Sequence, residues 1–272
     1  MNILSCIKII PDIEMLSPED MQVDETLQID TSFVRKKWNC FDESALEMLL
    51  KLSDLSEGFN VIYNLKALTI GNAQCDSFLK TLYALGFKKT IRIEPKTDVR
   101  FKPALIAGWI ADYCKKRDCV DVIVMGSQSE DDENGKTPYL TAERLNWPCI
   151  SQVTKIEPVD ETTLSIYQNT DEGEQIQKVN VPVVLAIGDA PNSYLRVPTL
   201  KDRMRVSKQS IELLTEENFG ENIAEYETEQ IELKQLERIN HTRKAHKILG
   251  DTMRQKTEAF YETYMKGQVD SE

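Results

Sequence analysis

The sequence has very few groups that could support imidazole or metal chemistry. Only two of its 272 residues are histidines, His241 and His246, and both lie near the C-terminus. The six cysteines are dispersed, and no two of them form a CxxC pair. We therefore expect reduced, structural thiols. We also expect no metal site and no histidine-based catalysis in the main part of the chain.

Long apolar runs and an excess of positive charge are also lacking. No stretch approaches the roughly 20 apolar residues of a membrane helix. The apolar start, residues 1–10, is short, carries Lys8 and has no signal-peptide pattern. The formal charge of −12 argues against nucleic acid and against an anionic membrane surface as partners. We expect a cytoplasmic protein without membrane insertion.

The first two-thirds of the chain alternates between short β-rich runs and helical patterns. The runs are residues 3–10, 61–70, 90–93 and 120–125, and the helical patterns are residues 42–53, 72–85, 103–116 and 137–145. This alternation predicts βαβ units, and hence an α/β fold with a doubly wound, mostly parallel sheet. Residues 164–168 and 175–181 then predict an antiparallel hairpin, and residues 183–187 a further buried strand.

The composition changes beyond about Ile211. Residues 216–237 hold eight glutamates against a single lysine, Lys234, which predicts a solvated acidic connector. Residues 252–266 then have helical character, with apolar side chains such as Met253 and Phe260. Such a helix cannot bury its apolar face alone, so it must dock on its own domain or on a partner.

Ligands of an open parallel sheet bind beyond the carboxyl ends of its strands, where helix N-termini suit phosphate. Four loops qualify: residues 9–12, 38–42, 69–73 and 126–141. In the last, Gly135, Lys136 and Thr137 open a helix, although a solvated loop with a threonine N-cap is the alternative. The loop is no P-loop, because Glu130 occupies a required glycine position. Residues 130–133, all acidic, lack the EF-hand order of ligands and are typical of a solvated charge run.

Several segments, in this order and spacing, resemble the electron transfer flavoprotein beta subunit over nearly the whole chain. They include NILSCIKIIPD (2–12), NCFDESAL (39–46), ALTIGNAQC (67–75), VDVIVMGSQSEDDENGKTPYLTA (120–142) and PTLKDRMR (198–205). The resemblance implies a Rossmann-like domain of the adenine nucleotide alpha hydrolase type over residues 1–213. Residues 214–272 would form an acidic connector and an extended C-terminal arm with a helix, which docks on an alpha subunit.

The function implied by this resemblance is electron transport rather than catalysis. As a heterodimer with the alpha subunit, such a protein carries electrons between flavin dehydrogenases of the acyl-CoA type and an acceptor. The redox FAD is held mainly by the alpha subunit. The beta subunit buries AMP in simple carriers, or a second FAD in NADH-dependent, electron-bifurcating relatives.

The resemblance also assigns site residues. The nucleotide-binding positions would be Cys6, Asn39, Cys40, Phe41, Asp42, Ile70, Asp131, Asp132, Glu133, Asn134, Gly135, Lys136, Thr137, Pro138, Tyr139, Leu140, Thr141 and Ala142. Leu200 corresponds to the anchor of the family's partner-recognition loop, and residues 237–267 correspond to its C-terminal arm.

The chain departs from the family pattern at three places. Cys40 replaces a proline, Ser129-Glu130 replaces an alanine-isoleucine pair, and Pro138 replaces a glycine. Pro138 has no amide hydrogen for a phosphate. Glu130 would repel phosphate unless it points away, whereas Lys136 could add compensating charge. A nucleotide-free structural or regulatory relative therefore stands as an alternative. An enzyme or ATP-binding module of the same superfamily would need a complete phosphate motif or a catalytic constellation, and the sequence has neither.

Overall fold

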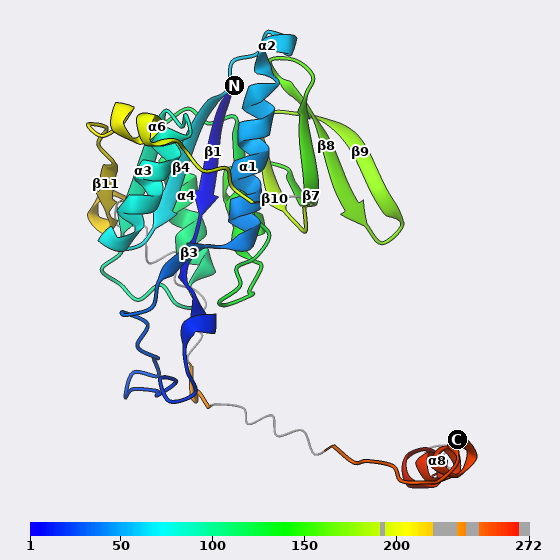
Figure 1. Cartoon of the computed structure of the whole chain (residues 1–272). Coiled ribbons are helices and arrows are strands. Elements are labelled where there is room, and N and C mark those ends of the chain that lie inside the picture. The colour runs from blue at the N-terminus through cyan, green and yellow to red at the C-terminus, as the bar shows by residue number, and fades with distance from the viewer. Residues whose placement is uncertain (191–193, 220–232, 238–244, 267–272) are drawn as a thin grey trace. The chain divides into compact units, whose positions relative to one another are not determined.

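The computed structural model describes residues 1–190, 194–219, 233–237 and 245–266. Its centre is a nine-stranded sheet in the order β11-β5-β4-β1-β6-β10-β7-β8-β9 (Figure 1). The parallel strands are β1 (Asn2–Ile7), β4 (Asn64–Ile70), β5 (Lys89–Glu94), β6 (Val122–Gly126), β10 (Val183–Ile187) and β11 (Glu212–Thr215). The predicted doubly wound, mostly parallel sheet is confirmed.

The sheet continues on one side into an antiparallel extension. Strand β7 (Cys149–Pro158) runs parallel to β10 but antiparallel to β8 (Thr163–Thr170), which pairs with β9 (Gly173–Asn180). The last two strands are the predicted hairpin, whereas β7 was not predicted.

Two helical layers cover the sheet because successive strand side chains point to opposite faces. Val122 and Val124 of β6 pack in one core with α1 (Cys40–Asp54) and α3 (Asp76–Ala84). Ile123 and Met125 pack in the other with α4 (Pro103–Lys116) and α5 (Thr137–Leu145). Figure 1 shows α1 in front of the sheet and α4 behind it.

Helix bounds follow local sequence signals more closely than strand bounds do. The bounds of α4 and α5 are those predicted, and each has proline in its first turn, where the missing N–H breaks no helical bond. The predicted helix over 72–85 instead begins as the 3-10 turn η2 (Ala73–Cys75) and continues as α3. Other short elements are η1 (Ile13–Met15), α2 (Ser56–Phe59) and α6 (Leu200–Arg205).

The first strand is shorter than predicted. It ends at Ile7, and β2 (Ile9–Pro11) pairs antiparallel with β3 (Lys36–Trp38) in a separate small sheet. The chain therefore leaves the main sheet at Lys8, which brings residue 8 to the edge where the strands end.

The chain divides into two compact units, Met1–Lys234 and Gln235–Glu272. The domain boundary expected at 213/214 stays a prediction. In the first unit, β11 and the turn η3 (Glu216–Phe219) continue the fold beyond residue 213. The prediction of a solvated connector over residues 216–237 is wrong at Phe219, because the side chain of Phe219 is buried. Residues 220–232 lie outside the described part.

In the second unit, the predicted helix over 252–266 is present as α8 (Met253–Phe260) and a π-helical turn, η4 (Tyr261–Met265). A capping box of Thr252 and Gln255 starts it. Its apolar side chains, including Met253 and Phe260, are exposed. Of the expected arm over 237–267, residues 238–244 and 267 lie outside the described part. No helix among the described residues is long and apolar enough to cross a membrane.

We predict that Phe219→Ala lowers the free energy of unfolding by about 3 kcal/mol or more, because a large core aromatic is removed. Phe219 is only 3% exposed and packs 6.2 Å from the Trp109 ring, centroid to centroid. Urea unfolding would measure the change, with the exposed Phe33→Ala as control. Equal stability of the two variants would contradict a core that extends to residue 219.

Candidate functional site

A cavity lies where the order of the sheet reverses. From β1 the chain proceeds to β4 and β5 on one side, and later to β6 and β10 on the other. Loops leaving β1 and β6 in opposite directions open a crevice at the carboxyl ends of these strands. The cavity measures about 790 Å³ when the open solvent at its mouth is counted, and residues 6–8 and 125–129 from these two strand ends line it.

One wall of the cavity is apolar. It is formed by side chains of β1, β4, β6, α4 and the loop before α4: Cys6, Leu68, Ile70, Val99, Ile106, Ile110 and Met125. Such a wall suits a flat ring system, and the cavity combines it with a small number of polar groups, as ligand sites commonly do.

A buried carboxylate joins the elements around the cavity. Asp42, in the first turn of α1, accepts hydrogen bonds from the Lys8 amide at 2.9 Å and from the Gly126 amide at 2.7 Å. Asn39 Nδ2 donates to the same carboxylate at 3.0 Å. Burial raises the pKa of Asp42 to about 6, although these three hydrogen bonds favour the charged form.

Gly126 is required by the close approach of α1 to the end of β6. A Cβ atom added at Gly126 would lie 2.7 Å from Phe41 Cβ and 2.9 Å from Asp42 Oδ1. Asn39 continues the contact beyond this point, because its side chain donates to the Gln128 carbonyl at 2.9 Å and accepts from the Glu130 amide at 3.2 Å. The loop after β6 is thus fixed to the start of α1.

Glu130 points away from the cavity. Its carboxylate accepts from the Cys40 amide, at the first residue of α1, and pairs with Lys37 Nζ at 2.7 Å. Partial burial opposes the charge, but the hydrogen bonds from Lys37 and Cys40 hold the pKa of Glu130 below its usual value. The expected repulsion of a phosphate by this residue is therefore weakened both by direction and by pairing.

The remaining acids of the loop are divided between the cavity and the surface. Lys8 Nζ pairs with Asp131 at 2.7 Å and Asp132 at 3.1 Å, and Ser129 also donates to Asp132. Asp132 lines the cavity, whereas Asp131 and Glu133 do not. In the described part of the chain, no three histidine, cysteine or acidic side chains are arranged to hold a metal ion.

The N-terminus of α5 faces the cavity. Gly135, Lys136, Thr137 and Pro138 all line it. Pro138 removes one amide donor from this turn, but the positive end of the helix dipole remains.

The cavity includes ten of the eighteen positions expected from the resemblance: Cys6, Asn39, Asp42, Ile70, Asp132, Asn134, Gly135, Lys136, Thr137 and Pro138. The other eight do not line it: Cys40, Phe41, Asp131, Glu133, Tyr139, Leu140, Thr141 and Ala142. Thr141 and Ala142 are buried residues of α5, and the Cys40 amide donates to Glu130. Whether these positions bind a nucleotide stays a prediction.

Sequence reasoning missed part of the lining. The missed residues include Lys8, Val99, Ile106 and Ile110. Residues 126–129 lie in the expected loop 126–141 but were not among the assigned site positions. Lys8, just after β1, could have been found from the rule that adjacent strands end at the ligand crevice. The i, i+4 spacing of Ile106 and Ile110 marks a helix face, but not the cavity that it covers.

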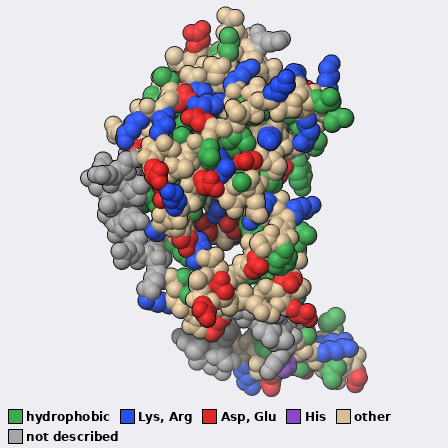
Figure 2. All heavy atoms as spheres, turned by 90° about the vertical axis from the view of Figure 1, so that its left-hand side faces the viewer, with side chains coloured by type: hydrophobic (Ala, Val, Ile, Leu, Met, Phe, Trp, Pro, Cys, Tyr) green, Lys and Arg blue, Asp and Glu red, His purple; other side chains and the backbone are tan. Residues whose placement is uncertain are grey.

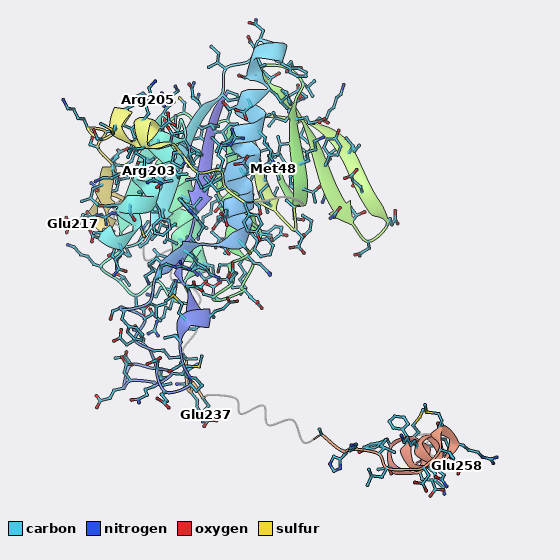
Figure 3. The ribbon with its side chains drawn as sticks, viewed as in Figure 1. Met48, Arg203, Arg205, Glu217, Glu237 and Glu258 are labelled. Carbon is cyan, nitrogen blue, oxygen red and sulfur yellow. The ribbon has the colours of Figure 1, made fainter. Side chains whose placement is uncertain are left out.

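Leu200 lies far along the chain from these residues, at the start of α6. Its side chain is 74% exposed, and Val197 and Met204 are exposed nearby in the sequence. Arg203 and Arg205 project from the same helix (Figure 3). Figure 2, which faces this side of the molecule, shows Lys and Arg side chains gathered over its upper part.

The sequence matches one protein family and several of its members. The family described as electron transfer flavoprotein domain matches residues 26–217. The chain is 30% identical to YgcR of Escherichia coli (strain K12), which is named as an electron transfer flavoprotein subunit, over 99% of each chain. It is 29% identical to the electron transfer flavoprotein subunit beta of Homo sapiens, over 70% of this chain and 72% of the human protein.

We predict that Asp42→Asn changes the pH dependence of stability. Because the folded-state pKa is about 6, above the unfolded value, the stability that Asp42 contributes is fully present below about pH 4. It is lost as the pH rises through 6, so Asp42 contributes roughly 1 kcal/mol more at pH 5 than at pH 7. The unfolding free energy of the wild type minus that of the variant should be larger at pH 5 by this amount.

Urea unfolding at both pH values would measure the difference, with Asp189→Asn, an exposed site, as control. Parallel pH profiles for the wild type and Asp42→Asn would contradict a raised pKa at this position.

Proposed function

The chain belongs to the electron transfer flavoprotein family, and we propose that it is the beta-type subunit of a heterodimeric electron carrier. In this proposal it catalyses no bond-making step and pairs with an alpha subunit that holds most of the redox FAD. The observation that carries the proposal is the cavity at the β1/β6 switch point, which lies at the position where a doubly wound sheet binds a nucleotide.

The cavity is proposed to bury an adenine nucleotide. Its apolar wall, with Ile70 and Ile106, would contact the flat base, and the polar side, with Asn134 and Thr137, would face ribose and phosphate. The start of α5 would provide a helix N-terminus for the phosphate. AMP is favoured, because residues 39–42 match the pattern of the simple carriers more closely than that of bifurcating relatives.

The arm is proposed to dock on the alpha subunit. Helix α8 and the turn η4 carry Met253, Phe260, Tyr261, Tyr264 and Met265, all of them exposed. A short helix with such side chains gains most of its stability from packing against another surface. The alpha subunit is the partner that membership of this family implies.

Leu200 is proposed to anchor contact with a flavin dehydrogenase. An exposed apolar side chain among basic ones suits transient docking on an acidic surface, because the apolar contact supplies affinity and the charges supply orientation. Lys201, Arg203, Arg205 and Lys208 are the neighbouring basic residues. Their positive charge stands out in a chain of net charge −12.

Contacts with α1 hold the segment that leads to Leu200. Arg196 donates to Glu47 through its backbone amide, Nε and Nη2, and pairs with Asp54 through Nη1 at 2.8 Å. The Leu195 amide donates to Glu43 at 3.2 Å. Glu47 is buried, and the hydrogen bonds from Arg196 outweigh the effect of burial and lower its pKa. The start of α6 is thus preorganised for a partner, which lowers the entropic cost of binding.

We predict that co-expression with an alpha subunit yields a yellow heterodimer that a flavin dehydrogenase can reduce. Acid extraction and chromatography should give one FAD and one AMP per heterodimer. Two FAD molecules would instead indicate the electron-bifurcating, NADH-dependent type. One FAD without a second nucleotide would indicate a structural or regulatory beta subunit, and a tight complex without flavin would refute the proposal.

Leu200→Ala is expected to raise the dehydrogenase concentration needed for half-maximal flavin reduction by roughly five- to thirty-fold, the loss typical of an interface anchor. Flavin content should not change, because Leu200 lines no part of the cavity. Stopped-flow reduction of the heterodimer would measure this effect. Ile62→Ala, at a site of similar exposure, is the matched control. Identical reduction kinetics for Leu200→Ala and Ile62→Ala would show that Leu200 is not part of the docking surface.

A further inference from the structure

Ser127 is a largely buried serine that lines the cavity. It follows Gly126 at the end of β6, is 9% exposed and lines the cavity. Its amide donates to the Ile187 carbonyl at 2.8 Å, so its position is fixed. Within the described residues, its Oγ atom makes no hydrogen bond, whereas the nearby Ser129 hydroxyl bonds to both Lys8 and Asp132. The Oγ atom keeps some accessible surface, so it is available to donate to a group that enters the cavity.

The backbone of Ser127 lies beside the turn that leads into α5. A Cβ atom built on Gly135 would be 3.6 Å from the Ser127 carbonyl oxygen, so the end of β6 and the turn before α5 are adjacent. Gly135 has a φ of +60°, the left-handed conformation that turns the chain into the helix. Ser127, Gly135 and Thr137 therefore line one corner of the cavity. Helix α5 has nine residues and directs its positive end there.

The charged side chains that line the cavity are balanced, two carboxylates against two lysines, Lys8 and Lys136. The two carboxylates that line the cavity, Asp42 and Asp132, are both engaged by donors of the protein. Lys136, which also lines the cavity, adds a positive charge at the start of α5. A serine hydroxyl can donate to a phosphate oxygen, and a hydrogen bond to a charged acceptor is stronger than one between neutral groups.

We propose that Ser127 is a ligand-binding residue, with its hydroxyl donating to the 5′-phosphate of the adenine nucleotide received at the start of α5. This inference rests on the proposed nucleotide function and adds a contact that the family resemblance does not assign. Ser127 thereby supplies a donor in the same corner where Pro138 lacks one.

Titration calorimetry of the heterodimer, freed of bound nucleotide, would test this contact with AMP and adenosine as probes. In Ser127→Ala, affinity for AMP should fall roughly tenfold or more, as for loss of a hydrogen bond to a charged group. Affinity for adenosine should stay within about twofold of the wild type, because adenosine has no phosphate. If the wild type prefers FAD, the same loss with FAD and not with adenosine supports the contact.

Ser5→Ala is the matched control. Ser5 is fully buried in β1, its hydroxyl has no partner in the described part of the chain, and it does not line the cavity. This variant should bind both probes as the wild type does. Unchanged AMP affinity in Ser127→Ala would overturn the inference, and so would equal losses for AMP and adenosine, which would show an altered cavity shape. A wild type that binds neither AMP nor FAD would overturn the proposed nucleotide function itself.

Discussion

The carboxylate of Asp42 is the constraint on which the site depends. Two parallel strands end side by side at the switch point, and the amides of Lys8, just beyond β1, and of Gly126, the last residue of β6, donate to a side chain there. Asp42 accepts from both and so joins β1, β6 and α1 at one buried point. The contact requires glycine at 126, because any side chain would collide with α1. Burial of a charge is costly, and the three hydrogen bonds to Asp42 offset much of that cost.

The loop after β6, with its four acids at residues 130–133, shows how an unfavourable charge can be made compatible with an anion site. Cys40 has an amide hydrogen where the family has proline, and Glu130, the second departure, accepts that hydrogen. Glu130 also pairs with Lys37, and Lys8 pairs with two of the next acids. The two departures are thus chemically complementary: one supplies a donor and the other its acceptor. Two lysines from outside the loop, Lys8 and Lys37, thus pair with three of its four acids.

Helix α1 connects the cavity with the proposed docking surface. Its first turn holds Asp42 and Glu43, and Glu47 lies one turn later. Glu43 and Glu47 accept hydrogen bonds from the backbone amides of residues 195 and 196. Leu200 follows four residues later, on α6. Both sites are therefore built on one rigid element of fifteen residues, so the nucleotide and the partner would be positioned by the same helix.

The sequence by itself determined the alternating pattern of strands and helices, the proline-started helices α4 and α5, and membership of the family. These depend on local periodicity, turn residues and ordered motifs. Strand β7 escaped prediction because its buried side chains recur every third residue, and its pairing is interrupted by register shifts, so the period of two is lost. Only the tertiary structure decided that Lys8, Ser127 and Ile106 line one cavity and that Glu130 turns toward Lys37. Each of these depends on elements distant in the chain meeting at the sheet edge, and no local pattern encodes that meeting.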